Sequence, residues 1–274
     1  MKKIISILLL FVTCSIAYAQ RSIEGLIQAE KSFAAYSVGH GTKDAFLKFL
    51  DSAGIVFEKG NPVNGIETWS KREKSSGILN WWPEFAEISN SNDFGYTTGP
   101  WTFQQSMNDS IVARGQYTTV WHIDRNGEWK FMIDLGVGRL PQSPVDEVKK
   151  INAAKLGAKA IFPGRLLSLE TAERDFIKLF SKNKKAAYRK YLSKECILNR
   201  NGHIPAIMAV EQQVIIDSTS SSILFTLAGW LVSPDQDMGF TYGIAVLNDK
   251  KDSYQRIWRR EKDGWKIALE VLRY

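Results

Sequence analysis

The sequence contains the same series of short motifs twice, in the same order, and this constrains the fold more than any other feature. The matched pairs are AEKSF (29–33) with AERDF (172–176), DFGYTTG (93–99) with DMGFTYG (237–243), and QYTTVWHIDRNGEWKF (116–131) with YQRIWRREKDGWKIAL (254–269). In the last pair, Tyr117 and Trp121 match Tyr254 and Trp258 at an offset of 137 positions. Self-similarity at a nearly fixed spacing indicates a repeated structural unit. We therefore expect two copies of a unit of roughly 120–130 residues, the usual size of a domain.

The first nineteen residues have the layout of a secretory signal peptide. MKK is followed by the apolar run IISILLLFV and then by small residues that end in AYA, which predicts cleavage after Ala19 and a secreted or periplasmic protein. A lipoprotein acylated at Cys14 is the alternative, but Thr13 is larger than the residue that normally precedes such a cysteine. The apolar run is too short for a stable membrane span, and no other segment approaches the required length.

The mature chain is mildly basic and has one cysteine. Without Lys2 and Lys3, 34 basic residues face 29 acidic ones, which gives a net charge of 34 − 29 = +5. So small a charge gives no indication of nucleic-acid binding. Cys196 has no partner for an intrachain disulfide, and its setting in ECIL predicts a small buried side chain.

Each copy reads as helices followed by strands, which predicts an α+β fold with a mostly antiparallel sheet. In the first copy, apolar residues recur at helical spacing from Ile23 until Gly39-His40-Gly41 ends the helix, and Thr42 is the expected N-cap of the next helix. Strand patterns follow from LNWWPEFAEIS to EWKFMIDLG. In the second copy we expect helices at 167–181 and 183–193, a strand near 195–199, and strands within 211–273.

Domain boundaries follow from these patterns. The expected division is a signal peptide at 1–19, a first domain at 20–138, a linker at 139–165 and a second, more degenerate domain at 166–274. Proline and glycine mark both ends of the linker, and its middle predicts a helix near 144–158.

The order of helix, helix and long sheet, ending in Tyr117…Trp121…Gly127…Trp129-Lys130, resembles the nuclear transport factor 2 (NTF2)-like superfamily. More narrowly, the AEKSF helix and GYTTGPW resemble the SnoaL-like and DUF4440 domains of exported bacterial proteins. The resemblance implies two tandem cone-shaped domains, each with a cavity between a curved sheet and its helices. Relatives use that cavity for isomerisation, dehydration, cyclisation, binding or assembly, so the fold does not decide the function.

Particular positions carry the resemblance further. The segment TTVWHIDRNGEWKF is similar to the end of the association domain of calmodulin-dependent protein kinase, which has cavity arginines at the positions of Thr119 and, without a bulge, Gly136. Both arginines are absent here, which argues against carboxylate binding by that route. SnoaL-type cyclases and ketosteroid isomerases place an acid–base residue in the cavity, and only Asp134 stands near such a position.

Aromatic residues are concentrated in the first copy, where they serve the core or line a ligand cavity. The candidate ligand-binding residues are Trp69, Trp81, Trp82, Trp101, Tyr117, Thr119 and Trp121. Trp121 and Trp129 recur in the second copy, which favours core packing for both. At the offset of 144, Phe225, Thr226 and Ala245 replace Trp81, Trp82 and Trp101, so the fold does not require tryptophan there.

Asp134 is the candidate catalytic residue, because a carboxylate within an apolar strand should have the raised pKa that acid–base chemistry needs. Glu270 is its counterpart in the second copy, which leaves a shared structural role open. No metal-ligand spacing and no cofactor motif is present.

These observations favour an exported protein that binds a small apolar or aromatic molecule in the first copy, while the second copy completes an intrachain pseudo-dimer. A cofactor-free isomerase or lyase that uses Asp134 is the first alternative, and a structural or assembly module is the second. A homodimer also remains open.

Overall fold

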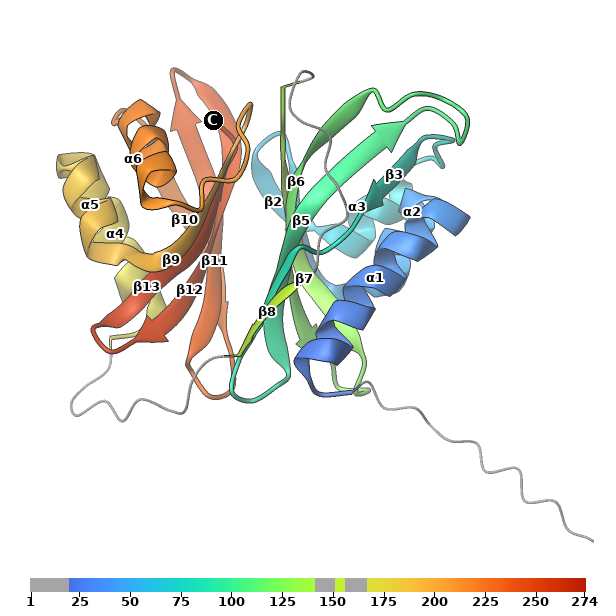
Figure 1. Cartoon of the computed structure of the whole chain (residues 1–274), viewed down its shortest axis with the longest axis horizontal. Coiled ribbons are helices and arrows are strands. Elements are labelled where there is room, and N and C mark those ends of the chain that lie inside the picture. The colour runs from blue at the N-terminus through green and yellow to red at the C-terminus, as the bar shows by residue number, and fades with distance from the viewer. Residues whose placement is uncertain (1–19, 141–150, 156–166) are drawn as a thin grey trace, which may run out of the picture.

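Two groups of helices and strands, one from each half of the chain, build the molecule (Figure 1). The computed structural model describes residues 20–140, 151–155 and 167–274, so the predicted signal peptide at 1–19 lies outside the described residues. The first unit consists of α1 (Ile23–His40), α2 (Thr42–Phe49), β1 (Leu50–Glu58), β2 (Asn61–Asn64), α3 (Gly65–Lys71), β3 (Ile78–Trp81), β4 (Phe85–Ile88), β5 (Phe94–Gln104), β6 (Ala113–Ile123), β7 (Trp129–Gly138) and β8 (Asn152–Lys155). The second unit consists of α4 (Leu169–Lys182), α5 (Lys184–Tyr191), β9 (Leu192–Arg200), α6 (Ala209–Ser218), β10 (Leu224–Val232), β11 (Met238–Leu247), β12 (Lys250–Glu261) and β13 (Gly264–Leu272).

Each unit contains one sheet, and both sheets are mostly antiparallel. The first has the strand order β2-β1-β7-β6-β5-β4-β8, with β3 also paired to β5, and the second has the order β10-β11-β12-β13-β9. The pairs β1·β7, β4·β8 and β13·β9 are parallel. Register shifts within β6·β7 and β12·β13 at equivalent places mark bulges, which bend a sheet. The fold is therefore the predicted α+β class, with helices packed on curved sheets.

Local signals in the sequence explain the ends of the first helices. The Ser22 side chain accepts a hydrogen bond from the Gly25 N–H at the start of α1, and Gly41, with φ of 91°, follows its last residue. The prediction that Thr42 caps α2 is wrong. Gly41 is the N-cap and Thr42 is the first helical residue, because the turn between the helices is a single glycine.

The segment between the units is not the predicted helix where the structure describes it. Residues Asn152–Lys155 form β8, which runs parallel to β4, and residues 141–150 and 156–166 lie outside the described residues. Strand β8 pairs the free edge of β4, so pairing between distant segments overrides the local helical pattern. In the second unit β9 covers the strand predicted near 195–199, and the strands predicted within 211–273 begin only at Leu224, because α6 precedes them.

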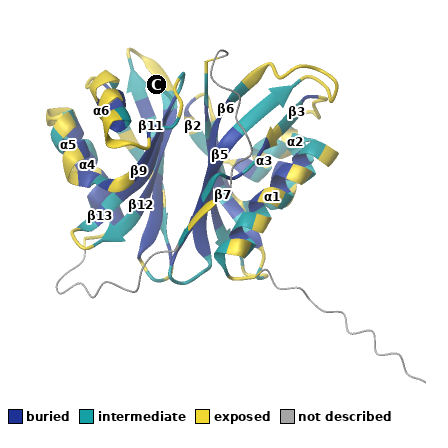
Figure 2. Ribbon diagram, in the orientation of Figure 1, coloured by how far each residue is buried: buried dark blue, intermediate teal, exposed yellow. Residues whose placement is uncertain are grey.

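The two sheets pack face to face, with the helices of each unit on the outer sides (Figures 1 and 2). Each sheet contributes six buried residues to the layer between them, namely Phe94, Tyr96, Val120, Ile133, Leu135 and Val137 from the first unit and Ile197, Met238, Phe240, Ile257, Leu269 and Val271 from the second. The salt bridge between Arg259 Nη1 and Glu87 Oε1, at 2.9 Å, crosses this layer. Burial of so many apolar side chains makes the inter-sheet layer a third hydrophobic core.

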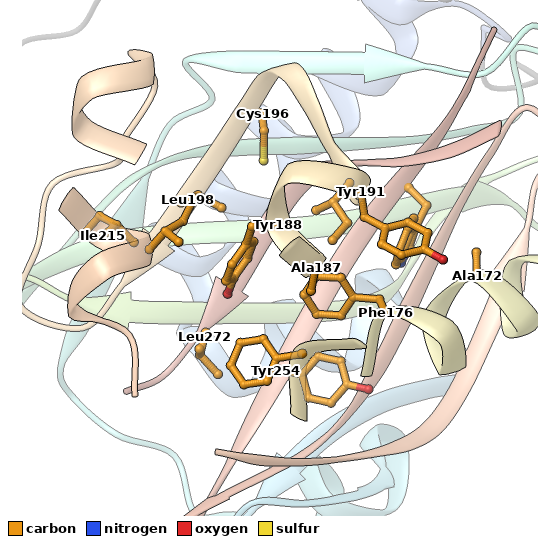
Figure 3. Packing of buried hydrophobic residues seen from close by; sticks show 14 of the residues in the cluster. Ala172, Phe176, Ala187, Tyr188, Tyr191, Cys196, Leu198, Ile215, Tyr254 and Leu272 are labelled. Carbon is orange, nitrogen blue, oxygen red and sulfur yellow. The ribbon is translucent and has the colours of Figure 1, made fainter. Parts of the chain in front are cut away.

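Each unit also has its own core between sheet and helices. In the first unit Phe33 of α1 packs on Phe131, with 4.8 Å between ring centroids, and on Trp81 at 4.7 Å. Figure 3 shows the corresponding core of the second unit, where Phe176, Tyr188 and Tyr254 converge from helices and sheet. Cys196 is a fully buried free cysteine in that core, as its apolar setting predicts.

Candidate functional site

A cavity of about 250 Å³ lies in the first unit, among side chains from α2, β3 and strands β5 to β7. It is lined by Phe46, Leu79, Trp81, Trp101, Tyr117, Asp134, Gly136, Val137, Gly138 and Arg273. Nine of these ten residues belong to the first unit, and Arg273 follows the last strand of the second. The lining is mainly apolar and aromatic, with Tyr117, Asp134 and Arg273 as its polar members.

Two glycines near the end of β7 line this cavity. Asp134, Gly136 and Gly138 alternate along the strand and therefore point to one face of the sheet. A Cβ atom on Gly136 would lie only 3.2 Å from the Trp101 indole nitrogen, so the tryptophan ring covers this glycine. The Trp101 Nε1 donates a hydrogen bond to the Val137 carbonyl at 3.2 Å, which holds the ring across the strand.

Asp134 is the acid of the cavity. Its Oδ1 accepts a hydrogen bond from the Thr119 hydroxyl at 3.0 Å, the one hydrogen bond to its side chain from the described residues. Burial and, secondarily, the negative charge of Glu30 raise the Asp134 pKa to about 7, although the bond from Thr119 opposes this shift. The side chain therefore exchanges a proton near neutral pH.

Glu30 lies behind the cavity wall and is fully buried. Its carboxylate accepts hydrogen bonds from the indole nitrogens of Trp81 at 2.5 Å and Trp121 at 2.8 Å, and from the Thr97 hydroxyl. Burial raises the pKa of Glu30, and these donors offset part of the rise because they stabilise the ionised form. The two acids thus share a region where one negative charge is tolerated far better than two.

The Tyr117 hydroxyl is the second polar group without a complete set of partners. It is buried and makes no hydrogen bond within the described residues. The Thr97 hydroxyl is near enough to influence its pKa but hydrogen-bonds Glu30 instead. Burial and the charge of Glu30 raise the pKa of Tyr117 well above its ordinary value, so the hydroxyl stays protonated and is able to donate. A buried hydroxyl without a partner costs free energy unless a ligand or water satisfies it.

The predicted site residues divide into two groups. Trp81, Trp101, Tyr117 and Asp134 line the cavity together. The other four candidates do not line the cavity; they are Thr119, Trp121, Trp69 and Trp82. Thr119 supports Asp134, and Trp121 is fully buried in the core against Glu30.

The remaining candidates lie outside the cavity. Trp69 stacks on the outer side of the cavity wall, with its ring centroid 4.1 Å from that of Phe46. Trp82 follows Trp81 and so falls on the other side of the strand, as the alternation of side chains requires. The His122 side chain is 25% exposed, and its Nε2 lies 2.8 Å from Asp51 Oδ2. Among the described residues, no group of three His, Cys, Asp or Glu side chains is arranged to hold a metal ion.

The second unit has charged side chains where the first has its cavity. Arg256 lies opposite Glu270 on β12 and β13, just as Thr119 lies opposite Asp134 on β6 and β7. The Arg256 Nε donates to Glu270 Oε2 at 2.5 Å, and its Nη1 pairs with Glu173, the counterpart of Glu30. Leu272, fully buried, occupies the position of Gly136.

This buried network is completed by Arg200, whose Nη2 bonds Glu270. Burial alone would raise the Glu270 pKa, but the Arg200 and Arg256 guanidinium groups lower it below its ordinary value. Glu270 is therefore held as an anion in a structural network, whereas Asp134 faces a cavity. The offset of 137 that relates Tyr117 to Tyr254 also relates Thr119 to Arg256, so the sequence alone already pairs this arginine with Thr119.

Comparisons with known proteins concern the fold alone. No family model matches the sequence, and no curated protein matches it. Solved structures do match, among them an NTF-2 like protein of unknown function from Shewanella oneidensis, with 11% identity over 39% of this chain and 96% of that one at a TM-score of 0.32. Others are an NTF2-like protein of unknown function from Cytophaga hutchinsonii (10% identity, 40% and 91% covered, TM-score 0.31) and a putative polyketide cyclase from Sinorhizobium meliloti (9%, 36% and 91%, 0.30).

Proposed function

We propose that the first unit binds a small molecule with a flat, apolar body in the cavity between its sheet and helices. The main support is the lining of the cavity, where the aromatic side chains of Phe46, Trp81 and Trp101 surround two polar groups. These are Tyr117, whose hydroxyl has no hydrogen-bond partner among the described residues, and Asp134, whose carboxyl group accepts one hydrogen bond. Apolar pockets with a few convergent polar groups are typical of small-molecule sites.

The cavity volume limits the size of the ligand. A cavity of about 150 Å³ is enough for benzene, and drug-sized ligands occupy about 300–1,000 Å³. At about 250 Å³, the cavity is suited to a molecule of one or two rings. The polar end of the ligand would accept a hydrogen bond from the Tyr117 hydroxyl and form a second hydrogen bond with the Asp134 carboxyl group.

The second unit has a different part in this proposal. Its acids are held by arginines, and its sheet packs on that of the first unit, so it acts as an intrachain partner and not as a second site. Duplication of one ancestral unit accounts for the matched motifs and the equivalent strand registers. The signal-peptide layout of residues 1–19 supports export to the periplasm or the exterior.

A substitution that fills the cavity tests this function. Gly138→Leu places a large side chain in the cavity, where no atom lies within 4 Å of the new Cβ, and should abolish binding while the fold is retained. Gly39→Leu is the matched control, because no atom lies within 4 Å of a Cβ placed there either. Tryptophan fluorescence and thermal shift against a set of one- and two-ring compounds provide the readout. Binding that survives Gly138→Leu would place the site elsewhere.

A second candidate function is cofactor-free acid–base catalysis, favoured by the Asp134 pKa of about 7. Asp134 would take a proton from the carbon next to a carbonyl group and return it elsewhere, while the Tyr117 hydroxyl donates to the carbonyl oxygen. Isomerisation or elimination on a small carbonyl compound fits this arrangement. Asp134→Asn should then lower turnover by about two to four orders of magnitude and leave ligand affinity nearly unchanged. If the variant retains full turnover, Asp134 serves binding alone.

A further inference from the structure

The second unit contributes a residue to the cavity of the first. Arg273, which follows β13, lines the cavity, and 40% of its side chain is exposed, so it lies at the open end. A specific contact holds it there. The Asn201 side chain accepts a hydrogen bond from the Gly138 N–H at 3.0 Å and donates one to the Arg273 carbonyl at 2.5 Å. The Gly202 N–H also donates to the Gly138 carbonyl, at 2.8 Å. The end of β7 and the residue after β13 are therefore fixed to each other.

The guanidinium group of Arg273 is only partly used by the protein. Its Nε lies 3.4 Å from Asp252 Oδ1, an ion pair without hydrogen-bond geometry, and this nitrogen is buried with no hydrogen-bond partner within the described residues. The same Asp252 oxygen already accepts bonds from the Ser253 N–H at 2.8 Å and the Ser253 hydroxyl at 3.2 Å. An arginine with five N–H donors and one loose ion pair retains capacity for an anion.

The polar groups lie at the two ends of the cavity. Asp134 is four residues from Gly138 along β7, a separation of about 13 Å at the usual rise of a strand. Arg273 sits at the Gly138 end, and the apolar walls of Trp81 and Trp101 lie between. A ligand that spans the cavity would therefore meet a neutral hydrogen-bonding end and a cationic end.

We propose that the ligand of this cavity is an aromatic or alicyclic anion of one ring, whose carboxylate or similar group is bound by Arg273 of the second unit. This inference rests on the proposed binding function and adds the chemical class of the ligand. The planar guanidinium matches a carboxylate in a two-bonded geometry, which gives both affinity and orientation. It also explains why a unit whose equivalent position is filled by charged side chains and Leu272 remains joined to the first: the site is incomplete without Arg273.

Binding of matched charged and neutral probes tests the proposal. 4-Hydroxybenzoate and 4-hydroxybenzamide have the same ring and hydroxyl and differ in the charge at the other end. We expect titration calorimetry on the mature protein at pH 7 to show the benzoate binding at least about tenfold more tightly. Arg273→Gln should remove this preference. Arg125→Gln, the same change in an exposed turn, should retain it.

A second variant separates anion binding from a structural role of Arg273. Asp252→Asn removes the competing charge but keeps the oxygen that Ser253 bonds, so benzoate affinity should rise if Arg273 binds the anion. Equal binding of the two probes, unchanged by Arg273→Gln, would overturn the anion inference and leave the binding function standing. If neither these probes nor any neutral or anionic ring compound of similar size binds the folded protein, the binding function itself fails, and the inference fails with it.

Discussion

At the scale of single residues, the side chain opposite the β7 or β13 acid decides what that acid does. In the second unit Arg256 lies between Glu173 and Glu270 and neutralises them. In the first unit the smaller Thr119 takes this place and supplies one hydroxyl to Asp134. Because threonine brings no positive charge to this position, burial and the charge of Glu30 raise the Asp134 pKa, and space remains beside the acid. A threonine in place of an arginine thus leaves an acid whose pKa lies near neutrality, where the second unit has a network of buried ion pairs.

The raised pKa of Asp134 predicts a pH-dependent stability. Between its ordinary pKa of 3.8 and its value of about 7, the folded protein keeps a proton that the unfolded chain releases. The free energy of unfolding contributed by this group therefore falls as pH rises from about 4 to about 7. Asp134→Asn cannot ionise, so relative to the natural protein it should gain on the order of 2–4 kcal/mol between pH 4.5 and pH 8.

Urea unfolding at these two pH values measures the difference. Asp263→Asn, at an exposed position, is the control and should show no such gain. An Asp134→Asn effect of the same size at both pH values would mean that Asp134 is ionised in the folded protein throughout.

At the scale of elements, the buried charges of the second unit tie helix α4 to strands β12 and β13. Glu173 lies on α4, Arg256 on β12 and Glu270 on β13, and all three side chains are fully buried. The guanidinium group also lies 4.3 Å from the Phe176 ring centroid and 4.4 Å from that of Tyr254. If Arg256 were removed, Glu270 would keep its ion pair with Arg200, whereas Glu173 would be a buried carboxylate without its arginine.

Arg256→Met should therefore destabilise the protein by roughly 3–5 kcal/mol, because unpaired buried charges cost more than the pairing contributes. The double variant Glu173→Gln, Arg256→Met removes the carboxylate that has lost its arginine, while Glu270 keeps Arg200, and it should recover most of that loss. Chemical denaturation of the natural protein and the two variants gives both values. A double variant as unstable as Arg256→Met would show that packing of the guanidinium group, and not charge, is what matters.

The elements themselves were largely predictable, because their patterns are local. Buried and partly buried residues alternate along all of β7, and Ser22 and Gly41 mark the two ends of α1. The strand β8 was not predictable, since it depends on the free edge of β4 far away in sequence. The sequence indicated Asp134 and the tryptophans as candidates. It could not separate Trp81 from Trp82, because which one faces the cavity depends on the register of β3.

At the scale of the whole molecule, the packing of sheet on sheet joins two unequal units into one site. Arg273 reaches the cavity only because Asn201 and Gly202 of the second unit bond the end of β7. No sequence pattern within either unit could reveal this, as it depends on how the two sheets are placed. No helix in the described part of the chain is long and apolar enough to cross a membrane.

The inter-sheet layer predicts that the two units unfold together and that ligand preference depends on their contact. Val120 is fully buried in this layer, and Ile257, at the equivalent position of the second unit, is 1% exposed. Val120→Asp would bury a carboxylate without a cation, at a cost of roughly 3–5 kcal/mol, so the melting temperature should fall by roughly 10 °C or the single transition should split in two. Thr226→Asp, on the exposed edge of β10, is the control.

Because the contact between the sheets positions Arg273, Val120→Asp should also weaken the preference for 4-hydroxybenzoate over 4-hydroxybenzamide at temperatures below the melting transition. A single transition at the natural midpoint, with the preference intact, would show that the sheets do not need each other in solution.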